Sequence, residues 1–334
     1  MACRHKIRLA PVNHVYQVAA DDSSLNEHGL FRFRLMARLK FSPPSFRILL
    51  LAWGIITSSS LHAATIIDSI DPQQYRDEAS LYPSVAELTG AIFGGSGVVI
   101  SDRWVLTAGH IALGKTGGTV TVGGNSYTVQ SSIVHPNYSY PSNPNDIGLL
   151  YLSSSISGVA PAKMLKLDGP LSILGREATW VGHGLGGNGV FGAAGPLDFR
   201  AFTNIIDVMG PAYGLTDTAF VSDFDNPDGS TTTSGSDPTA TRLEGNVASG
   251  DSGGGVFITV DGVRYLVGIS SFTGGFVAGA NSKYGSISGA TNLQLFHDWI
   301  ADETGVTAIP EPGVFGLCLI TAGLALLPRR RAAK

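Results

Sequence analysis

The stretch Gly250-Asp251-Ser252-Gly253-Gly254 constrains the fold of this chain more than any other feature. Its glycines permit a tight turn with backbone angles that other residues avoid, and they let another backbone approach closely. A serine on such a turn is suited to act as a nucleophile, but its hydroxyl needs a base, and the base needs an orienting acid. The fold must therefore bring a histidine and an aspartate to Ser252 from elsewhere in the chain.

Two upstream segments can supply these partners. His110 closes the sequence Thr107-Ala108-Gly109-His110 and follows a strand-like run at 104–107. Asp146 directly precedes the apolar run 147–152, which predicts that it lies at the mouth of a strand. The order along the chain is His110, Asp146, Ser252, with separations of 36 and 106 residues.

These three segments resemble the trypsin/chymotrypsin family of serine peptidases in motif and in order, over roughly residues 80 to 300. The resemblance implies that Ser252 attacks the substrate carbonyl, that His110 transfers the proton, and that Asp146 orients His110. It implies an oxyanion hole formed by the amides of Gly250 and Ser252. The implied reaction is hydrolysis of a peptide bond through an acyl-enzyme, and it requires neither a cofactor nor a metal ion.

The resemblance also assigns residues to substrate binding. Ser271, Phe272 and Thr273 would run beside the substrate backbone, and Asn246, six residues before the nucleophile, would lie at the base of the primary pocket. Because Asn246 is neutral, it would leave a buried substrate cation without a counter-charge. We therefore predict cleavage after medium apolar or small polar residues, unless Glu244 supplies an acid to the pocket instead.

Composition favours an all-β domain. Charged residues make up 14% of the chain, and 43 of its 334 residues are glycine, which fits many short strands joined by turns. With the family resemblance, this predicts two antiparallel β-barrels, at about 65–168 and 169–306, with the active site in the cleft between them. Apolar residues at helical spacing predict a C-terminal helix at roughly 289–303.

The charge and cysteine content limit what this domain can do. Residues 65–306 hold 10 Lys/Arg and 22 Asp/Glu, a net charge of −12, so a nucleic-acid partner is not expected because such binding needs a basic face. The two cysteines, Cys3 and Cys318, lie outside this range. An internal disulfide, a cysteine nucleophile and a cysteine metal site are therefore excluded from the domain.

The N-terminal segment 1–64 is predicted to direct export. After Met36, basic residues precede an apolar run of nine residues at 48–56, and small residues follow at Ala63 and Ala64. This pattern is typical of a secretory signal peptide whose natural start is Met36; a signal anchor with a cytoplasmic extension is the alternative. Signal peptidase would then free an N-terminus near Ala64 that either pairs with Asp251 or leaves Asp251 to stabilise its own turn.

The C-terminal segment 307–334 resembles a PEP-CTERM sorting signal. It contains Pro310-Glu311-Pro312, an apolar run of 14 residues at 314–327, and arginines at 329–331. The resemblance implies transient retention in the inner membrane, cleavage by an exosortase, and release to the surface or matrix of a Gram-negative bacterium. A plain membrane anchor is the alternative.

Other polar residues give weaker indications of a function. Oxygen-bearing side chains from Asp223 to Asp228 form either a weak calcium site or, more simply, a polar loop, since their spacing does not match an EF-hand. His135 and His183 lack a surrounding catalytic motif and are predicted to be structural. Two further functions stay open for the whole chain: a peptidase fold that serves as a binding module, and an esterase that uses the same three residues.

Overall fold

The computed structural model describes residues 64–90, 94–140, 144–167, 172–230, 238–275 and 282–311. The chain divides into two compact units, residues 1–57 and 58–334, and every described residue belongs to the second. The predicted signal peptide, both cysteines and the tail after Glu311 lie outside the described residues. Within those ranges, no helix is long and apolar enough to cross a membrane.

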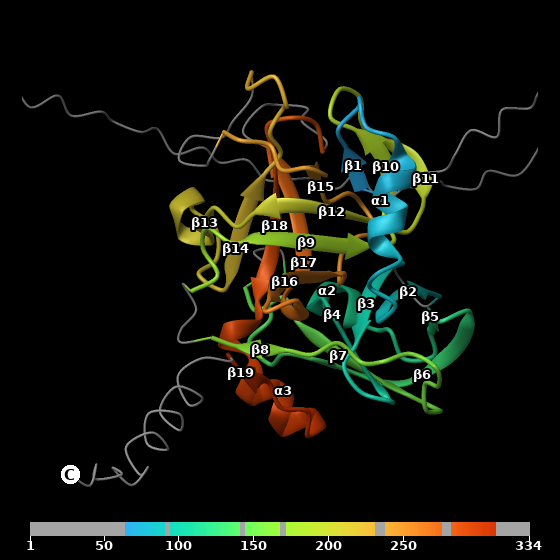
Figure 1. Ribbon diagram of the computed structural model, residues 1–334. Coiled ribbons are helices and arrows are strands. Elements are labelled where there is room, and N and C mark those ends of the chain that lie inside the picture. Colours follow the sequence, from blue (N-terminus) through green and yellow to red (C-terminus); the bar gives the residue numbers. More distant parts are fainter. Residues whose placement is uncertain are drawn as a thin grey trace, which may run out of the picture. The chain divides into compact units, whose positions relative to one another are not determined.

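Six antiparallel strands close into a barrel in the order β2-β3-β4-β7-β6-β5 (Figure 1). Their bounds are β2 Val85–Thr89, β3 Gly95–Val99, β4 Trp104–Thr107, β5 Thr119–Val122, β6 Asn125–Val134 and β7 Gly148–Leu152. In β5 the valines are buried and the threonines are half-exposed, because successive side chains of a strand point to opposite faces. Gly123 and Gly124 both have positive φ and form the predicted hairpin turn between β5 and β6.

The second half of the fold consists of two further sheets. The seven-stranded sheet has the order β12-β9-β16-β17-β18-β14-β13, and the four-stranded sheet has the order β11-β10-β1-β15. Their bounds are β1 Ala64–Ile66, β9 Glu177–Gly182, β10 Leu185–Asn188, β11 Gly192–Leu197, β12 Arg200–Ile205, β13 Val208–Met209, β14 Ala219–Asp223, β15 Gly245–Asn246, β16 Gly255–Val260, β17 Val263–Gly275 and β18 Ser286–Asn292. A hydrogen bond from Asn204 of β12 to the Asp223 carbonyl of β14 shows that the larger sheet curls strongly, since these strands are not neighbours in it.

The fold is mostly β, as predicted, but the ring of β2 to β7 is the one closed barrel among the described strands. The start of this barrel also differs from the predicted start at residue 65. The segment from residue 64 to 79 lies on the second half, where β1 pairs with β10 and β15 and Tyr75 is buried in the second core. The first barrel therefore takes none of its strands from this segment, because β1 completes the four-stranded sheet instead.

Two helices show what the sequence patterns detected and what they missed. Helix α1 (Pro72–Ala79) was not predicted, although Asp71 caps it by accepting a hydrogen bond from the Gln73 amide at 2.9 Å and Pro72 opens it. The predicted helix at 289–303 begins only at His297, since residues up to Asn292 belong to β18. A 3₁₀ turn, η2 (Leu293–Leu295), precedes α3 (His297–Thr304), and a second one, η1 (Gly210–Tyr213), follows β13.

The apolar residues whose spacing predicted the C-terminal helix pack in or against the core, but not all of them lie in the helix. Leu293, Phe296 and Ile300 are buried in the core of the barrel, yet Leu293 lies in η2 and Phe296 between the two helices. The second core gathers around Trp180, whose ring stacks on Phe202 with centroids 5.8 Å apart.

The segment that links the two halves of the fold pairs with the C-terminal end of the described chain. There β8 (Leu165–Lys166) pairs in parallel with β19 (Ile309–Pro310). A short helix in the barrel half, α2 (Gly109–Ala112), follows β4 directly and carries His110.

Candidate active site

His110 and Asp146 form a hydrogen-bonded pair at the ends of two paired strands. In the antiparallel ladder of β4 and β7, Thr107 lies opposite Gly148, so the residues just after Thr107 and just before Gly148 meet at one end of the barrel. The Nδ1 atom of His110 lies 2.8 Å from Oδ2 of Asp146, and the His110 amide donates to Oδ1 at 2.9 Å. Asp146 is almost fully buried, whereas the His110 side chain is 25% exposed.

This pair assigns the roles of the two imidazole nitrogens. A carboxylate can only accept hydrogen bonds, so Nδ1 carries the proton in neutral His110, as assigned from this network. The Nε2 atom is then left as an acceptor for a proton from a nucleophile. Asp146 thereby holds His110 in the tautomer that a general base requires.

Asp146 has a second side-chain donor that the sequence did not indicate. The Ser271 hydroxyl, on β17, donates to Oδ2 of Asp146 at 2.5 Å, and Thr291 donates to the Asp146 carbonyl at 2.8 Å. The Ser271 side chain is thus buried against Asp146 and takes no part in the predicted run of residues 271–273 beside the substrate backbone. Only its backbone stays available for that role.

Ser252 lies on a glycine turn that packs against the barrel. Gly250 and Gly253 have φ values of +98° and +86°, which favour glycine strongly. A Cβ atom on Gly253 would lie 2.1 Å from the Ser96 carbonyl oxygen of β3. The glycine at 253 thus allows the turn to approach the barrel that carries His110.

The atoms proposed to meet the substrate are not used by the fold. Ser252 is half-buried, and its hydroxyl makes no hydrogen bond with any described residue. The amides of Gly250 and Ser252 likewise donate to no described acceptor, whereas the intervening Asp251 amide bonds to the Ala248 carbonyl at 3.0 Å. Two unused amides on either side of an occupied one match the requirement for an oxyanion hole.

Asp251, next to the nucleophile, is buried on the side away from His110's barrel. Its Oδ2 atom accepts from the Ala248 amide at 2.8 Å, and burial raises its pKa to about 7. Asp251, Arg200 and Ala64 lie close together, and Arg200 donates to the Ala64 carbonyl at 3.2 Å. The structure thus places the predicted processing region beside Asp251.

Comparisons with known proteins agree with this geometry. The family model described as Trypsin matches residues 75–199, a range that includes His110 and Asp146. This match supports a trypsin-like serine peptidase. The chain is 28% identical over 224 residues to Chymotrypsin-2 of Vespa crabro, an alignment that covers 60% of this chain and 85% of that protein.

A solved structure shares the fold of this chain. The structure described as HL collagenase superposes with a TM-score of 0.52 at 19% identity and covers 69% of this chain and 96% of that one. At this identity the likeness concerns the fold alone.

Asn246, the predicted base of the substrate pocket, lies within a buried polar network. Its Nδ2 atom donates to the Val247 carbonyl at 2.9 Å and to the Thr273 hydroxyl at 2.8 Å. Its Oδ1 atom accepts from Ser288 at 2.7 Å. Phe272 is half-exposed, and its ring packs over Gly289 of β18, where a Cβ would lie 2.1 Å from the ring. The structure therefore brings Asn246 and Thr273 together, and it sets Phe272 beside β18.

Glu244 cannot replace Asn246 as the acid of a pocket. One carboxylate oxygen accepts from the Thr241 amide and hydroxyl at 2.6 and 2.7 Å, and the other accepts from the Asp225 amide at 3.3 Å. Glu244 is 1% exposed, and burial raises its pKa to about 8 against the opposing effect of these donors. The alternative that Glu244 supplies the missing acid is thus wrong.

The buried Glu244 predicts a dependence of stability on pH. Its pKa is about 8 in the folded protein, against the ordinary glutamate value of 4.5 that applies to the unfolded chain, so between these values the folded state binds more protons. The free energy of unfolding is then expected to fall as the pH rises from about 5 to 8, by up to about 1.4 kcal/mol per pH unit. Glu244→Gln should flatten this slope in denaturant titrations at several pH values.

The control for this prediction is Glu303→Gln, which changes an exposed glutamate and should leave the slope unaltered. Some slope should persist in Glu244→Gln, because the raised pKa of Asp251 acts in the same direction. An identical slope in Glu244→Gln and in the natural protein would contradict the prediction.

The remaining sequence candidates lie apart from these groups. His135 packs its ring against Phe296 and Trp299, with centroids 5.2 and 5.0 Å apart. His183 stacks on Phe199 at 4.4 Å, and burial lowers its pKa to about 4. Both therefore pack as structural side chains.

The acidic segment 223–228 does not converge on one point. Asp223 belongs to β14 and Asp225 is buried near Glu244, whereas Asp228 accepts from the Ser230 amide in an exposed turn. No group of three or more His, Cys, Asp or Glu among the described residues is arranged to hold a metal ion.

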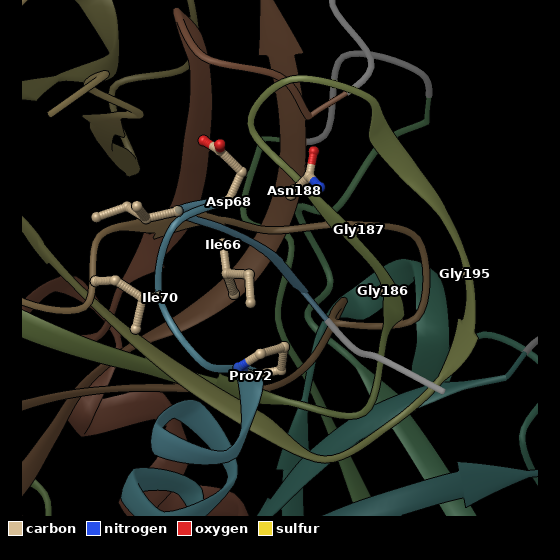
Figure 2. A pocket seen from close by; sticks show the side chains of 9 residues that line it. Ile66, Asp68, Ile70, Pro72, Gly186, Gly187, Asn188 and Gly195 are labelled. Atoms are coloured by element: carbon tan, nitrogen blue, oxygen red, sulfur yellow. The ribbon is translucent and has the colours of Figure 1, made fainter. Parts of the chain in front are cut away.

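A surface pocket of about 290 Å³ lies away from these residues (Figure 2). It is formed between the loop at 66–72 and the β10–β11 hairpin, with Ile66, Ile70 and Pro72 on one side and Gly186 and Asn188 on the other. None of the candidate catalytic or substrate-binding residues lines it.

Proposed function

We propose that this protein is an exported serine endopeptidase that acts through Ser252, His110 and Asp146. The observation that carries the proposal is the His110–Asp146 pair, whose Nε2 atom is free to accept a proton beside a turn that presents an unbonded serine hydroxyl. A base and a nucleophile often lie further apart without substrate and approach when it binds. The absence of a hydrogen bond between them in this state is compatible with the proposal.

The proposed reaction has two steps. Ser252 Oγ attacks the scissile carbonyl while Nε2 of His110 takes its proton, and the amides of Gly250 and Ser252 stabilise the oxyanion. His110 then donates that proton to the leaving amine. In the second step His110 deprotonates a water molecule, which attacks the acyl carbonyl, and His110 then returns this proton to Ser252 Oγ as the acid product leaves. Asp146 stabilises the imidazolium in both steps without becoming protonated.

Labelling and hydrolysis together test this function. The purified protein should hydrolyse casein, and a fluorophosphonate should add once, at Ser252, as located by peptide mass mapping. Labelling without casein hydrolysis would support the binding-module alternative. Hydrolysis of an ester but not of the matching amide would support the esterase, and failure to label Ser252 would reject both enzymatic functions.

We further propose that the pocket selects small or medium uncharged residues. The Asn246–Thr273 hydrogen bond joins the proposed base of the pocket to its entrance, which shortens the space for a long side chain. Asn246 carries no charge to pair with a substrate cation, and an unpaired cation is costly to bury.

Asn246→Asp is expected to change this preference. The new carboxylate would supply a counter-charge, so the ratio of kcat/KM for Lys or Arg over Ala at the cleaved position should rise by at least about tenfold. A peptide library digested before and after the change measures this ratio. Asn204→Asp is the matched control, since Asn204 is also buried and bonded to backbone carbonyls. A profile unchanged by Asn246→Asp would remove Asn246 from the pocket.

Export and sorting are the remaining part of the proposal. The signal-peptide pattern before Ala64 and the PEP-CTERM-like tail support secretion with transient membrane retention, after which a signal peptidase and an exosortase would trim the two ends. Of the tail motif, Pro310 and Glu311 lie within the described residues, where Glu311 pairs with Arg176 at 3.1 Å. The intact mass of the protein secreted by its own host tests both ends, and an intact Lys334 would contradict the sorting proposal.

A further inference from the structure

Ser96, on β3, is a buried serine whose polar atoms all make hydrogen bonds. It is 0% exposed, and no motif in the sequence marks it as functional. Its amide donates to the Ser252 carbonyl at 2.8 Å. Its hydroxyl donates to the Gly250 carbonyl at 2.9 Å and accepts from the His183 amide at 2.8 Å. Its own carbonyl accepts from the Thr107 hydroxyl at 2.7 Å.

Two of these bonds hold the nucleophile turn on both sides of Asp251. The carbonyls of Gly250 and Ser252 belong to the peptide units that flank the Asp251–Ser252 peptide. Fixing both carbonyls limits rotation of the segment that carries the Ser252 hydroxyl and amide. Gly250, with φ of +98°, has more backbone freedom than any other residue type would have, so its orientation depends strongly on such a bond.

The other two bonds tie the same residue to both halves of the fold. Thr107 is the last residue of β4, three residues before His110, and it lies opposite Gly148, two residues after Asp146. His183 follows β9 in the second half. Ser96 therefore joins the strand that leads to the base, the turn that carries the nucleophile, and the sheet behind that turn.

We infer that Ser96 is a positioning residue that sets the orientation of the oxyanion amides and of Ser252 relative to His110. This inference rests on the proposed function, and it adds a residue that acts on the reaction through the nucleophile turn without touching the substrate. A hydroxyl suits this buried position because its one oxygen donates to one backbone group and accepts from another at the same time.

The inference predicts a defect in turnover rather than in substrate binding. In Ser96→Ala the Gly250 carbonyl and the His183 amide lose their partner, and the Gly250–Asp251 peptide is then held through the bond of the Asp251 amide to the Ala248 carbonyl alone. The amides would then point less well at the oxyanion, an interaction that is made in the transition state and not in the bound substrate. Loss of one oxyanion donor lowers kcat by about 10²–10³-fold, so misorientation should lower kcat by at least about tenfold with little change in KM.

The experiment compares Ser96→Ala with Ser101→Ala in the full-length protein. Ser101 follows β3, and its hydroxyl accepts from the amides of Arg103 and Trp104 at 3.4 and 3.1 Å, so its loss perturbs the same barrel away from the turn. The measurements are kcat, KM, Tm, and the affinity for a peptide aldehyde, which needs Ser252 and the oxyanion hole to bind. Ser96→Ala should weaken aldehyde binding by the same factor as kcat/KM, whereas Ser101→Ala should lower Tm alone.

Several outcomes would overturn the inference. One is a Ser96→Ala protein with a lower Tm and normal kcat and aldehyde affinity, which would make Ser96 merely structural. If Ser96→Ala does not fold, Thr107→Val removes one bond of the same network and should lower kcat at constant KM by a smaller factor; unchanged kcat there counts equally against the inference.

The rate of fluorophosphonate labelling separates this inference from the proposed function. A natural protein that labels at Ser252 but cleaves no peptide contradicts the proposed peptidase activity. The Ser96→Ala variant should still label at least about tenfold more slowly in that case, because labelling uses the same hydroxyl and amides. Equal labelling rates would reject the role of Ser96 whatever the natural substrate is.

Discussion

Replacing Ser252 with alanine is expected to lower kcat by about 10⁶-fold and to leave KM within a small factor. The nucleophile and the base act as a unit, so removing one member costs nearly as much as removing all of them. The residual rate should lie about 10³–10⁴-fold above the uncatalysed rate, because the oxyanion amides and substrate binding persist. Hydrolysis of a chromogenic peptide, followed over several days, measures the difference.

The control for this experiment is Ser249→Ala. Ser249 is an exposed residue three positions earlier on the same turn, so its change tests the turn without the nucleophile. Ser249→Ala should retain turnover and fluorophosphonate labelling, and Ser252→Ala should lose both. A Ser252→Ala protein that still hydrolyses peptides at a substantial rate would show that another residue is the nucleophile.

Replacing Asp146 with asparagine is expected to lower kcat by about 10⁴-fold without loss of the fold. The asparagine amide can donate toward Nδ1 of His110, which stabilises the tautomer with its proton on Nε2. That tautomer cannot accept the Ser252 proton. The same amide, standing at the position of Oδ2, can donate to the Ser271 hydroxyl, which in the natural protein donates to Asp146 at 2.5 Å. The asparagine oxygen can still accept from the His110 amide, so the local structure should hold. Steady-state kinetics near neutral pH, with circular dichroism of the variant, tests both parts.

Asp102→Asn is the matched control for this change. Asp102 lies in the turn between β3 and β4, and its carboxylate accepts from the Ser155 hydroxyl at 3.0 Å on the exposed side of the barrel. The same chemical change there should leave kcat unaltered. Comparable activities of Asp146→Asn and Asp102→Asn would contradict the role of Asp146 as the residue that orients His110.

Local patterns in the sequence were enough to select the candidate catalytic residues, because each of them lies at a feature that can be recognised from its neighbours in the chain. His110 follows a strand and Asp146 precedes one, and antiparallel pairing of β4 with β7 brings those two strand ends together. The hairpin at Gly123-Gly124 was predictable for the same reason, since only a few residues decide its turn.

Residues whose roles depend on distant partners were not predictable. Ser271 and Ser96 are ordinary strand serines in sequence, and only the approach of β17 to Asp146 and of β3 to the nucleophile turn gives them partners. Glu244 is a similar case. Its position two residues before Asn246 suggested that it could reach the pocket, but its buried carboxylate bonds to Thr241 and Asp225 instead.

The sequence by itself determined the all-β class, the order of the catalytic candidates and the neutral residue at 246, because turn glycines, strand patterns and motif spacing act over short distances. The tertiary structure alone decided that residues 64–79 complete the second half, that β18 runs on to Asn292 before α3 begins, and that Ser96 links three segments. Those outcomes depend on which strand edges and buried polar groups find partners far away in the chain, and short-range preferences carry no information about them.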